Sequence, residues 1–196
     1  MSKLAIIGTA GRAADGSRLA SNPKKYWDTM KRAALKVAEL TKSNILVSGG
    51  AAWADHIAIN LHLWYPSQFG LELELPAHFT TITSLDGIYE DNGERDSKSN
   101  PGGTANYYHR QFKLAVQTFD PYWNPIIDLD LVRPKTHLPD KRHIEITITP
   151  GFLERNLVVA SKADHVLAMT FGNGPQLKDG GTAHTMRHFL VRKDHG

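Results

Sequence analysis

ILVSGGAAWAD, residues 45–55, is the stretch that decides the fold. Its first three residues are apolar, which is typical of a strand buried on both faces of a sheet. Gly49 and Gly50 then indicate a tight turn, and the small residues from Ala51 open a helix expected to end at Trp64. This order of strand, glycine turn and helix predicts an α/β unit whose helix N-terminus lies at the carboxyl edge of a parallel sheet.

Two further stretches repeat that order. LAIIGTAGR, residues 4–12, predicts a strand over 4–7 and a polar loop over 9–21, followed by a helix from Pro23 with Asn22 as its cap. Near the other end, we expect a helix over 152–162, a strand over 166–169 and a final helix over 182–191. Three glycine turns at helix starts predict a site for an anion, most simply the phosphate of a nucleotide.

The middle of the chain is less regular. The other elements are expected as a strand over 71–76, a turn at Asn100-Pro101-Gly102-Gly103, a helix over 107–119, irregular chain over 121–139 and a strand over 144–148. Together the patterns predict a single α/β domain over residues 1–196, a Rossmann-like doubly wound parallel sheet with an insertion at about 79–150. Ligands of such sheets bind beyond the carboxyl ends of the strands.

Composition bounds the function. The chain has 196 residues, no cysteine and a formal net charge of +3, which excludes a disulfide framework and a thiolate nucleophile. The charge favours anionic ligands only mildly, and the basic stretch 133–143 is interpreted as a solvated loop or a polyanion patch. Without a long apolar run or a signal pattern, we expect a soluble cytoplasmic protein with no membrane partner.

The candidate ligand-binding residues come from the three turns and the helix over 152–162. Backbone amides near the glycines are expected to hold phosphate, and two arginines to supply positive charge. Asp55 has two interpretations, as an acceptor for ribose hydroxyls or as a first-turn charge or cap. The full candidate set is Gly8, Thr9, Arg12, Ser48, Gly49, Gly50, Asp55, Arg155, Asn156, Gly180, Gly181, Thr182 and Thr185.

The motif SGGAAWADHIA, residues 48–58, resembles the SGGARGxDxxA signature of the SLOG superfamily, which includes the Smf/DprA proteins and the LOG-type phosphoribohydrolases. Arg155-Asn156 with Ala163-Asp164 resembles the RN…(S/A)D segment of that superfamily, and the stretch 180–185 resembles its last loop. The resemblance covers both ends of the chain, in order, and implies a Rossmann-like fold that binds nucleotides.

The last loop departs from the LOG pattern. Those enzymes carry PGGxGTxxE, and the alignment places Thr185 where their glutamate acts. A threonine cannot supply the carboxylate that stabilises an oxocarbenium-like transition state. If the protein is catalytic, the candidates to replace that glutamate are Glu154, Asp179 and His109.

Three functions remain open. The first is a binder or sensor of a nucleotide-derived small molecule, a form that also allows a homo-oligomer whose partner subunit covers the site. The second is hydrolysis or transfer at the N-glycosidic bond of a nucleotide, and the third, weaker one is Smf/DprA-like binding of single-stranded DNA. No cofactor is expected, and no metal, because His184 and His188 lack a recognisable third ligand. Trp53 is expected to stack on a base or fill the core, and His56 to face solvent.

Overall fold

The protein is described by a computed structural model over residues 1–84, 87–96, 98–132, 143–172 and 180–194. Its main sheet has five parallel strands in the order β6-β3-β2-β1-β7. They are β1 (Ser2–Gly8), β2 (Ser43–Ser48), β3 (Gly70–Pro76), β6 (Ile144–Thr149) and β7 (His165–Met169). This arrangement confirms the predicted Rossmann-like doubly wound α/β fold.

The order of the strands contains one reversal. From β1 the chain moves outward through β2, β3 and β6, and it then returns to place β7 on the free side of β1. In a doubly wound sheet, the crevice at such a reversal is where ligands bind, beyond the carboxyl ends of the strands. Here those ends are Gly8 of β1 and Met169 of β7, which are paired in register.

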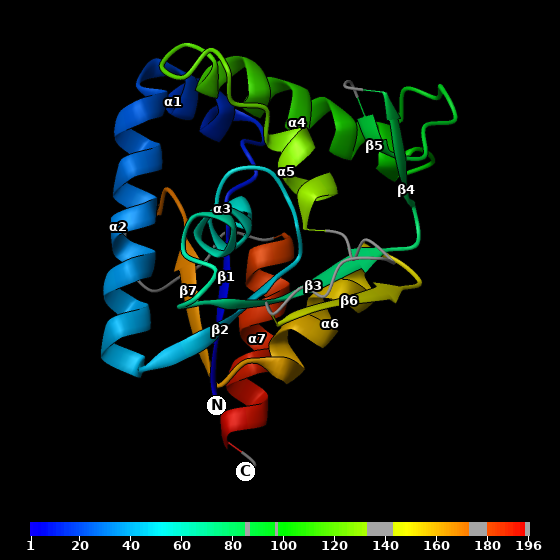
Figure 1. Ribbon diagram of the computed structural model, residues 1–196. Coiled ribbons are helices and arrows are strands. Elements are labelled where there is room, and N and C mark those ends of the chain that lie inside the picture. The colour runs from blue at the N-terminus through cyan, green and yellow to red at the C-terminus, as the bar shows by residue number, and fades with distance from the viewer. Residues whose placement is uncertain (85–86, 97, 133–142, 173–179, 195–196) are drawn as a thin grey trace, which may run out of the picture.

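Helices cover both faces of the sheet. α2 (Pro23–Thr41) and α3 (His56–Trp64) lie on one face, and α6 (Phe152–Lys162) and α7 (Gly181–Asp194) on the other (Figure 1). The alternation of side chains along a strand explains this division. Leu4 and Ile6 of β1 join the core under α2 and α3, whereas Ala5 and Ile7 pack in the separate cluster with residues of α6 and α7.

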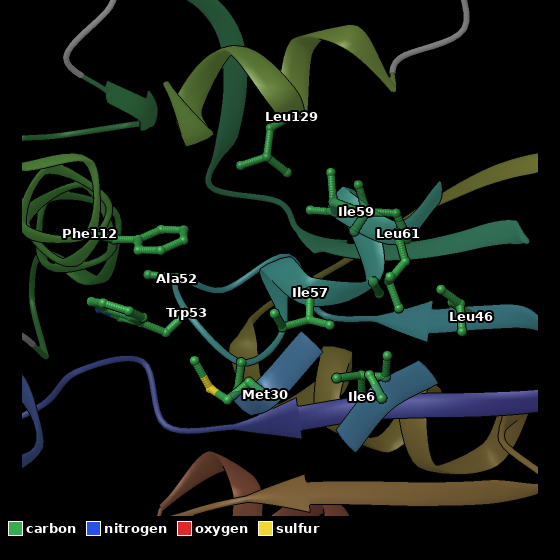
Figure 2. Close-up of a cluster of buried hydrophobic side chains, with 14 of the residues drawn as sticks. Ile6, Met30, Leu46, Ala52, Trp53, Ile57, Ile59, Leu61, Phe112 and Leu129 are labelled. Carbon is green, nitrogen blue, oxygen red and sulfur yellow. The ribbon is translucent and has the colours of Figure 1, made fainter. Parts of the chain in front are cut away.

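The larger core joins the sheet to the middle of the chain. Figure 2 shows Ile6 and Leu46 of the sheet facing side chains of α2 and α3, with Phe112 and Leu129 closing the cluster from the other side. Phe112 belongs to α4 (Pro101–Val116) and Leu129 to α5 (Pro125–Leu131). Both residues are fully buried, so the middle segment is part of the hydrophobic core.

Several expected boundaries were wrong. The loop expected over 9–21 contains α1 (Ala14–Ser21), a short helix with Leu19 as its one buried residue, too little for a helical pattern. The turn expected at 100–103 is the start of α4, because the Asn100 side chain accepts from Gly103 N–H and caps the helix. α5 lies within the stretch expected to be irregular.

The expected insertion is shorter than predicted. It contains the two-stranded antiparallel pair β4 (Phe79–Ser84) and β5 (Gly87–Tyr89), followed by α4 and α5. β6, however, pairs with β3 over 144–149 and is a strand of the main sheet, so the added elements end before it. Asn106 of α4 accepts hydrogen bonds from the N–H groups of Ile88 and Tyr89, which fixes β5 to this helix.

Among the described helices, none has the length and apolar character needed to cross a membrane.

Candidate functional site

A cavity of about 330 Å³ opens at the reversal between β1 and β7. Eleven of the thirteen candidate ligand-binding residues line it, and they come from β1, the β2 turn, α6 and α7. Those eleven are Gly8, Thr9, Arg12, Gly49, Asp55, Arg155, Asn156, Gly180, Gly181, Thr182 and Thr185. The structure thus brings together residues from both ends of the sequence at one sheet edge.

Two oppositely charged side chains form the floor of this cavity. Asp55 is 5% exposed and Arg155 is 8% exposed, and a Cβ atom added at Gly49 would lie 2.9 Å from Arg155 Cζ and 3.0 Å from Asp55 Oδ2. Burial raises the pKa of Asp55, while the charge of Arg155 and backbone hydrogen bonds from Ala51, Gly8 and Gly49 oppose that rise. Asp55 therefore faces the backbone of two turns, and it makes no side-chain cap for α3.

Arg155 is also held by the protein. Its Nη1 donates to Gly49 O at 3.0 Å, and its Nη2 and Nε donate to Asn156 Oδ1 at 2.8 and 3.2 Å. These contacts fix the orientation of the guanidinium, which remains part of the cavity floor. Asn156, the second residue of the expected motif, therefore positions Arg155.

Ser48 and Gly50 lie outside the cavity lining and shape the β2 turn. Ser48 Oγ donates to Asp55 O at 2.8 Å and accepts from Gly50 N–H at 3.1 Å. Gly50 has a φ of +68°, and a Cβ there would lie 2.9 Å from Leu75 Cδ2. Glycine is needed at this position for both its backbone conformation and the close packing.

The N-terminus of α7 provides backbone donors to the cavity. Gly180, Gly181 and Thr182 line it, and the first N–H groups of a helix have no acceptor within the helix. Thr182 Oγ1 donates to Gly8 O at 3.0 Å and so attaches this helix start to the end of β1. Thr185 Oγ1 donates to Gly181 O at 3.0 Å, one turn back in α7.

Arg12 and Asp15 also line the cavity. Arg12 is exposed, and its guanidinium carbon lies 5.5 Å from the ring centroid of Tyr108. Asp15, in the first turn of α1, accepts a hydrogen bond from Thr9 Oγ1 at 2.9 Å. Asp15 was not among the expected site residues, because α1 was expected to be a loop. The signal that could have identified Asp15 is an acidic residue three positions after Arg12, in the first turn of a helix.

Of the three residues proposed for catalysis, His109 and Glu154 lie outside the cavity lining, and Asp179 lies outside the described residues. His109 is 1% exposed, with Nδ1 3.0 Å from Ala105 O and Nε2 3.2 Å from Gly50 O. Burial lowers its pKa to about 4, so the ring is neutral near pH 7 and fixed in α4. Glu154 is exposed on α6 away from the cavity lining, and Asp179 lies outside the described residues.

Two expectations near the β2 turn are resolved in favour of packing. Trp53 is 3% exposed, with its ring centroid 4.7 Å from that of Phe112, and it fills the core. His56 was expected to face solvent, which is wrong. It is fully buried, and its Nε2 lies 3.0 Å from Asp128 Oδ2 in α5. Two segments distant in sequence make this contact, so no local pattern could predict it.

One group of described residues has metal-ligand chemistry. Ligand atoms of Glu72, His143 and Glu145 lie within 4.8 Å of one another at the N-terminal end of the sheet. The ammonium groups of Lys3 and Lys162 already neutralise these carboxylates, at 2.6 Å from Glu72 and 2.8 Å from Glu145. His184 and His188 have ring centroids 4.6 Å apart, and they belong to no group of three ligands among the described residues.

Comparison with known proteins identifies one relative. The chain is 31% identical over 188 residues to the uncharacterized protein R261 of Acanthamoeba polyphaga mimivirus, an alignment that covers 93% of this chain and 88% of that protein. The chain belongs to the same family as R261. No protein-family model matches the chain, and no solved structure matches it.

Proposed function

We propose that this chain, as a member of the R261 family, binds a nucleotide-derived phosphorylated small molecule in the cavity between β1 and β7. One observation carries the proposal. The N-terminus of α7 and the exposed guanidinium of Arg12 lie in a single cavity at the reversal of a doubly wound sheet. A helix N-terminus and an arginine both favour phosphate. The resemblance of the three turns to SLOG motifs supports the same proposal.

The phosphate position that we propose differs from the first expectation. The backbone N–H groups of Gly8 and Gly49 already donate to the Asp55 carboxylate, and that of Gly50 donates to Ser48 Oγ. These three groups are therefore occupied by side chains of the protein. The N–H groups that begin α7 are the better donors. Within the described part of the chain, the Arg12 side chain donates no hydrogen bond that it would have to give up to bind the same anion. Arg155 then acts mainly through the shape and charge of the floor.

The remaining lining fits a ribose and a base. The Asp15 carboxylate can accept hydrogen bonds from ribose hydroxyls, the role first considered for Asp55. Phe171, half-buried in the wall, offers an apolar surface against which a base can pack. A cavity of about 330 Å³ is of the size that binds small ligands.

The direct test is calorimetric titration of the protein with nucleoside monophosphates, diphosphates, cyclic nucleotides and the parent nucleosides. Arg12→Ala should weaken a phosphorylated ligand at least tenfold and leave the nucleoside unchanged. Arg32→Ala is the matched control, because Arg32 is exposed on α2 and outside the cavity. Equal effects of the two substitutions, or no binding of any phosphorylated ligand, would refute the proposal.

Asp15 also favours a second candidate function, cleavage of an N-glycosidic bond. A half-buried carboxylate within the cavity can stabilise positive charge on a ribosyl group or activate water, the task of the glutamate that Thr185 replaces. The test is release of free base from nucleoside monophosphates, measured by mass spectrometry. Release by the wild type that is lost in Asp15→Asn and kept in Glu154→Gln would establish this activity. Intact, retained nucleotide would establish a binder.

A further inference from the structure

We infer that a second cleft, between α2, α3 and the turn after α4, binds a neutral saccharide. The cleft has a volume of about 390 Å³ and shares no residue with the cavity at β1 and β7. Three of the four tryptophans of the chain line it, namely Trp27, Trp64 and Trp123. The inference is independent of the proposed function.

Aromatic rings form the walls of this cleft, and some of them are left open to water. Trp64 is 70% exposed and Tyr122 is 98% exposed, although burying such a ring would be favourable. Trp123 forms a fixed wall, because its Nε1 donates to Asp128 Oδ2 at 2.7 Å and its ring lies 4.7 Å from that of Trp27. Exposed rings beside rigid ones provide flat faces for the C–H surface of a sugar ring.

A buried amide in the cleft lacks a partner. Asn60 of α3 is 4% exposed and lines the cleft, and its Oδ1 accepts no hydrogen bond within the described part of the chain. A buried polar atom without a partner costs free energy, and most such atoms in proteins are satisfied. Almost none of this oxygen is open to solvent, so a ligand hydroxyl that supplies the missing donor must displace a neighbouring side chain of the cleft.

The charges in the cleft favour a neutral ligand. Asp28 and Asp120 line it and would repel an anion. A cation would meet the ammonium group of Lys31, which already lies 5.7 Å from the Trp64 ring centroid and 5.6 Å from that of Tyr65. The acceptors of the cleft are the Asn60 amide and two carboxylates, of which Asp28 already accepts from Lys24 Nζ at 2.6 Å, and they match O–H groups placed around a ring. A nucleobase offers fewer donors, and only along its edge.

The test is saturation-transfer NMR and tryptophan fluorescence of the full chain with neutral sugars. The probes are glucose, galactose, mannose, N-acetylglucosamine and their β-linked disaccharides at about 10 mM, a concentration that detects millimolar affinity. We expect transfer to the C–H protons of at least one sugar. Transfer to none of them would overturn the inference, as would binding of adenine or tetramethylammonium in their place.

Two substitutions locate the binding. Trp64→Ala should weaken the sugar at least tenfold and Trp64→Phe should restore most of the affinity, whereas Tyr107→Ala, an exposed aromatic outside the cleft, should change nothing. Asn60→Leu should abolish sugar binding while the melting temperature of the free protein stays equal or rises, because the unpartnered oxygen is removed. Sugar binding retained in Trp64→Ala or in Asn60→Leu would overturn the inference.

Discussion

Arg155 Nη1 donates a hydrogen bond to the carbonyl oxygen of Gly49 at 3.0 Å, and this contact joins α6 to the turn after β2. The two residues are 106 positions apart in the chain. The contact holds the buried guanidinium of Arg155 against the glycine turn, and the Asp55 carboxylate lies on the same side of Gly49, since both groups lie within 3.0 Å of the position that a Gly49 Cβ would take. The glycine is therefore required by the charged pair below it.

Gly49→Val should abolish binding of a nucleoside monophosphate by displacing Arg155. Its Cβ would lie 2.9 Å from both Cζ and Nε of Arg155, so the guanidinium must move. Overpacking of this kind costs about 1–3 kcal/mol of folding free energy. Calorimetric titration and urea unfolding provide the two measurements. In a double-mutant cycle, Gly49→Val should cause little further loss of affinity or of folding free energy in a protein that already carries Arg155→Ala. Additive losses would show that the valine acts elsewhere.

Removing one member of the Asp55–Arg155 pair should destabilise the protein strongly. Both side chains are buried and interact electrostatically, so Asp55→Asn or Arg155→Ala removes the buried partner of the other, a change that costs about 3–5 kcal/mol. For a chain of this length that corresponds to a fall in melting temperature of about 10 °C. The double variant Asp55→Asn/Arg155→Ala should lose less than the sum of the two single losses, as measured by thermal unfolding. A loss equal to the sum would mean that the two charges do not interact.

His109 should make folding sensitive to acid. Its pKa is about 4 in the folded protein, against 6.5 for an unperturbed histidine, so the unfolded chain binds more protons between those values. The stabilising contribution is complete above pH 6.5 and is lost as the pH falls toward 4, at most about 3 kcal/mol in total. The free energy of unfolding, measured with urea at intervals from pH 7 to 4, should fall less steeply with decreasing pH for His109→Gln than for the wild type. Identical slopes would rule out a buried neutral His109.

Salt dependence separates a nucleotide from a DNA strand. A single nucleotide engages one cluster of phosphates, so its affinity should fall only slightly between 50 and about 200 mM salt, whereas a strand bound through many phosphates gives a steep decline. Fluorescence anisotropy of a labelled oligonucleotide, measured beside a labelled nucleoside monophosphate, makes the comparison. Tight oligonucleotide binding with a steep salt slope would favour the Smf/DprA-like function.

The elements of the sheet were largely predictable, whereas the middle of the chain was not. α6 begins and ends at the predicted residues, and the helix predicted from Pro23 is capped by Asn22 as expected. Apolar strands followed by glycine turns are local patterns that survive in any tertiary context. α5 and the burial of His56 depend on each other through Asp128, a contact across 72 residues that no window of sequence contains.

The sequence by itself determined that Gly8, Gly49 and Gly181 share one sheet edge, because parallel strands align their carboxyl ends. The helix expected directly after the turn at Gly50 begins only at His56. The tertiary structure alone decided which polar groups at that edge are available. Folding buried Asp55 against Arg155, hydrogen-bonded the amide of Gly50 to Ser48, and placed His109 in the core and Asp15 in the cavity. The physical reason is that burial and the choice of hydrogen-bond partner depend on residues far apart in the chain, which meet only after the sheet and its helices have packed.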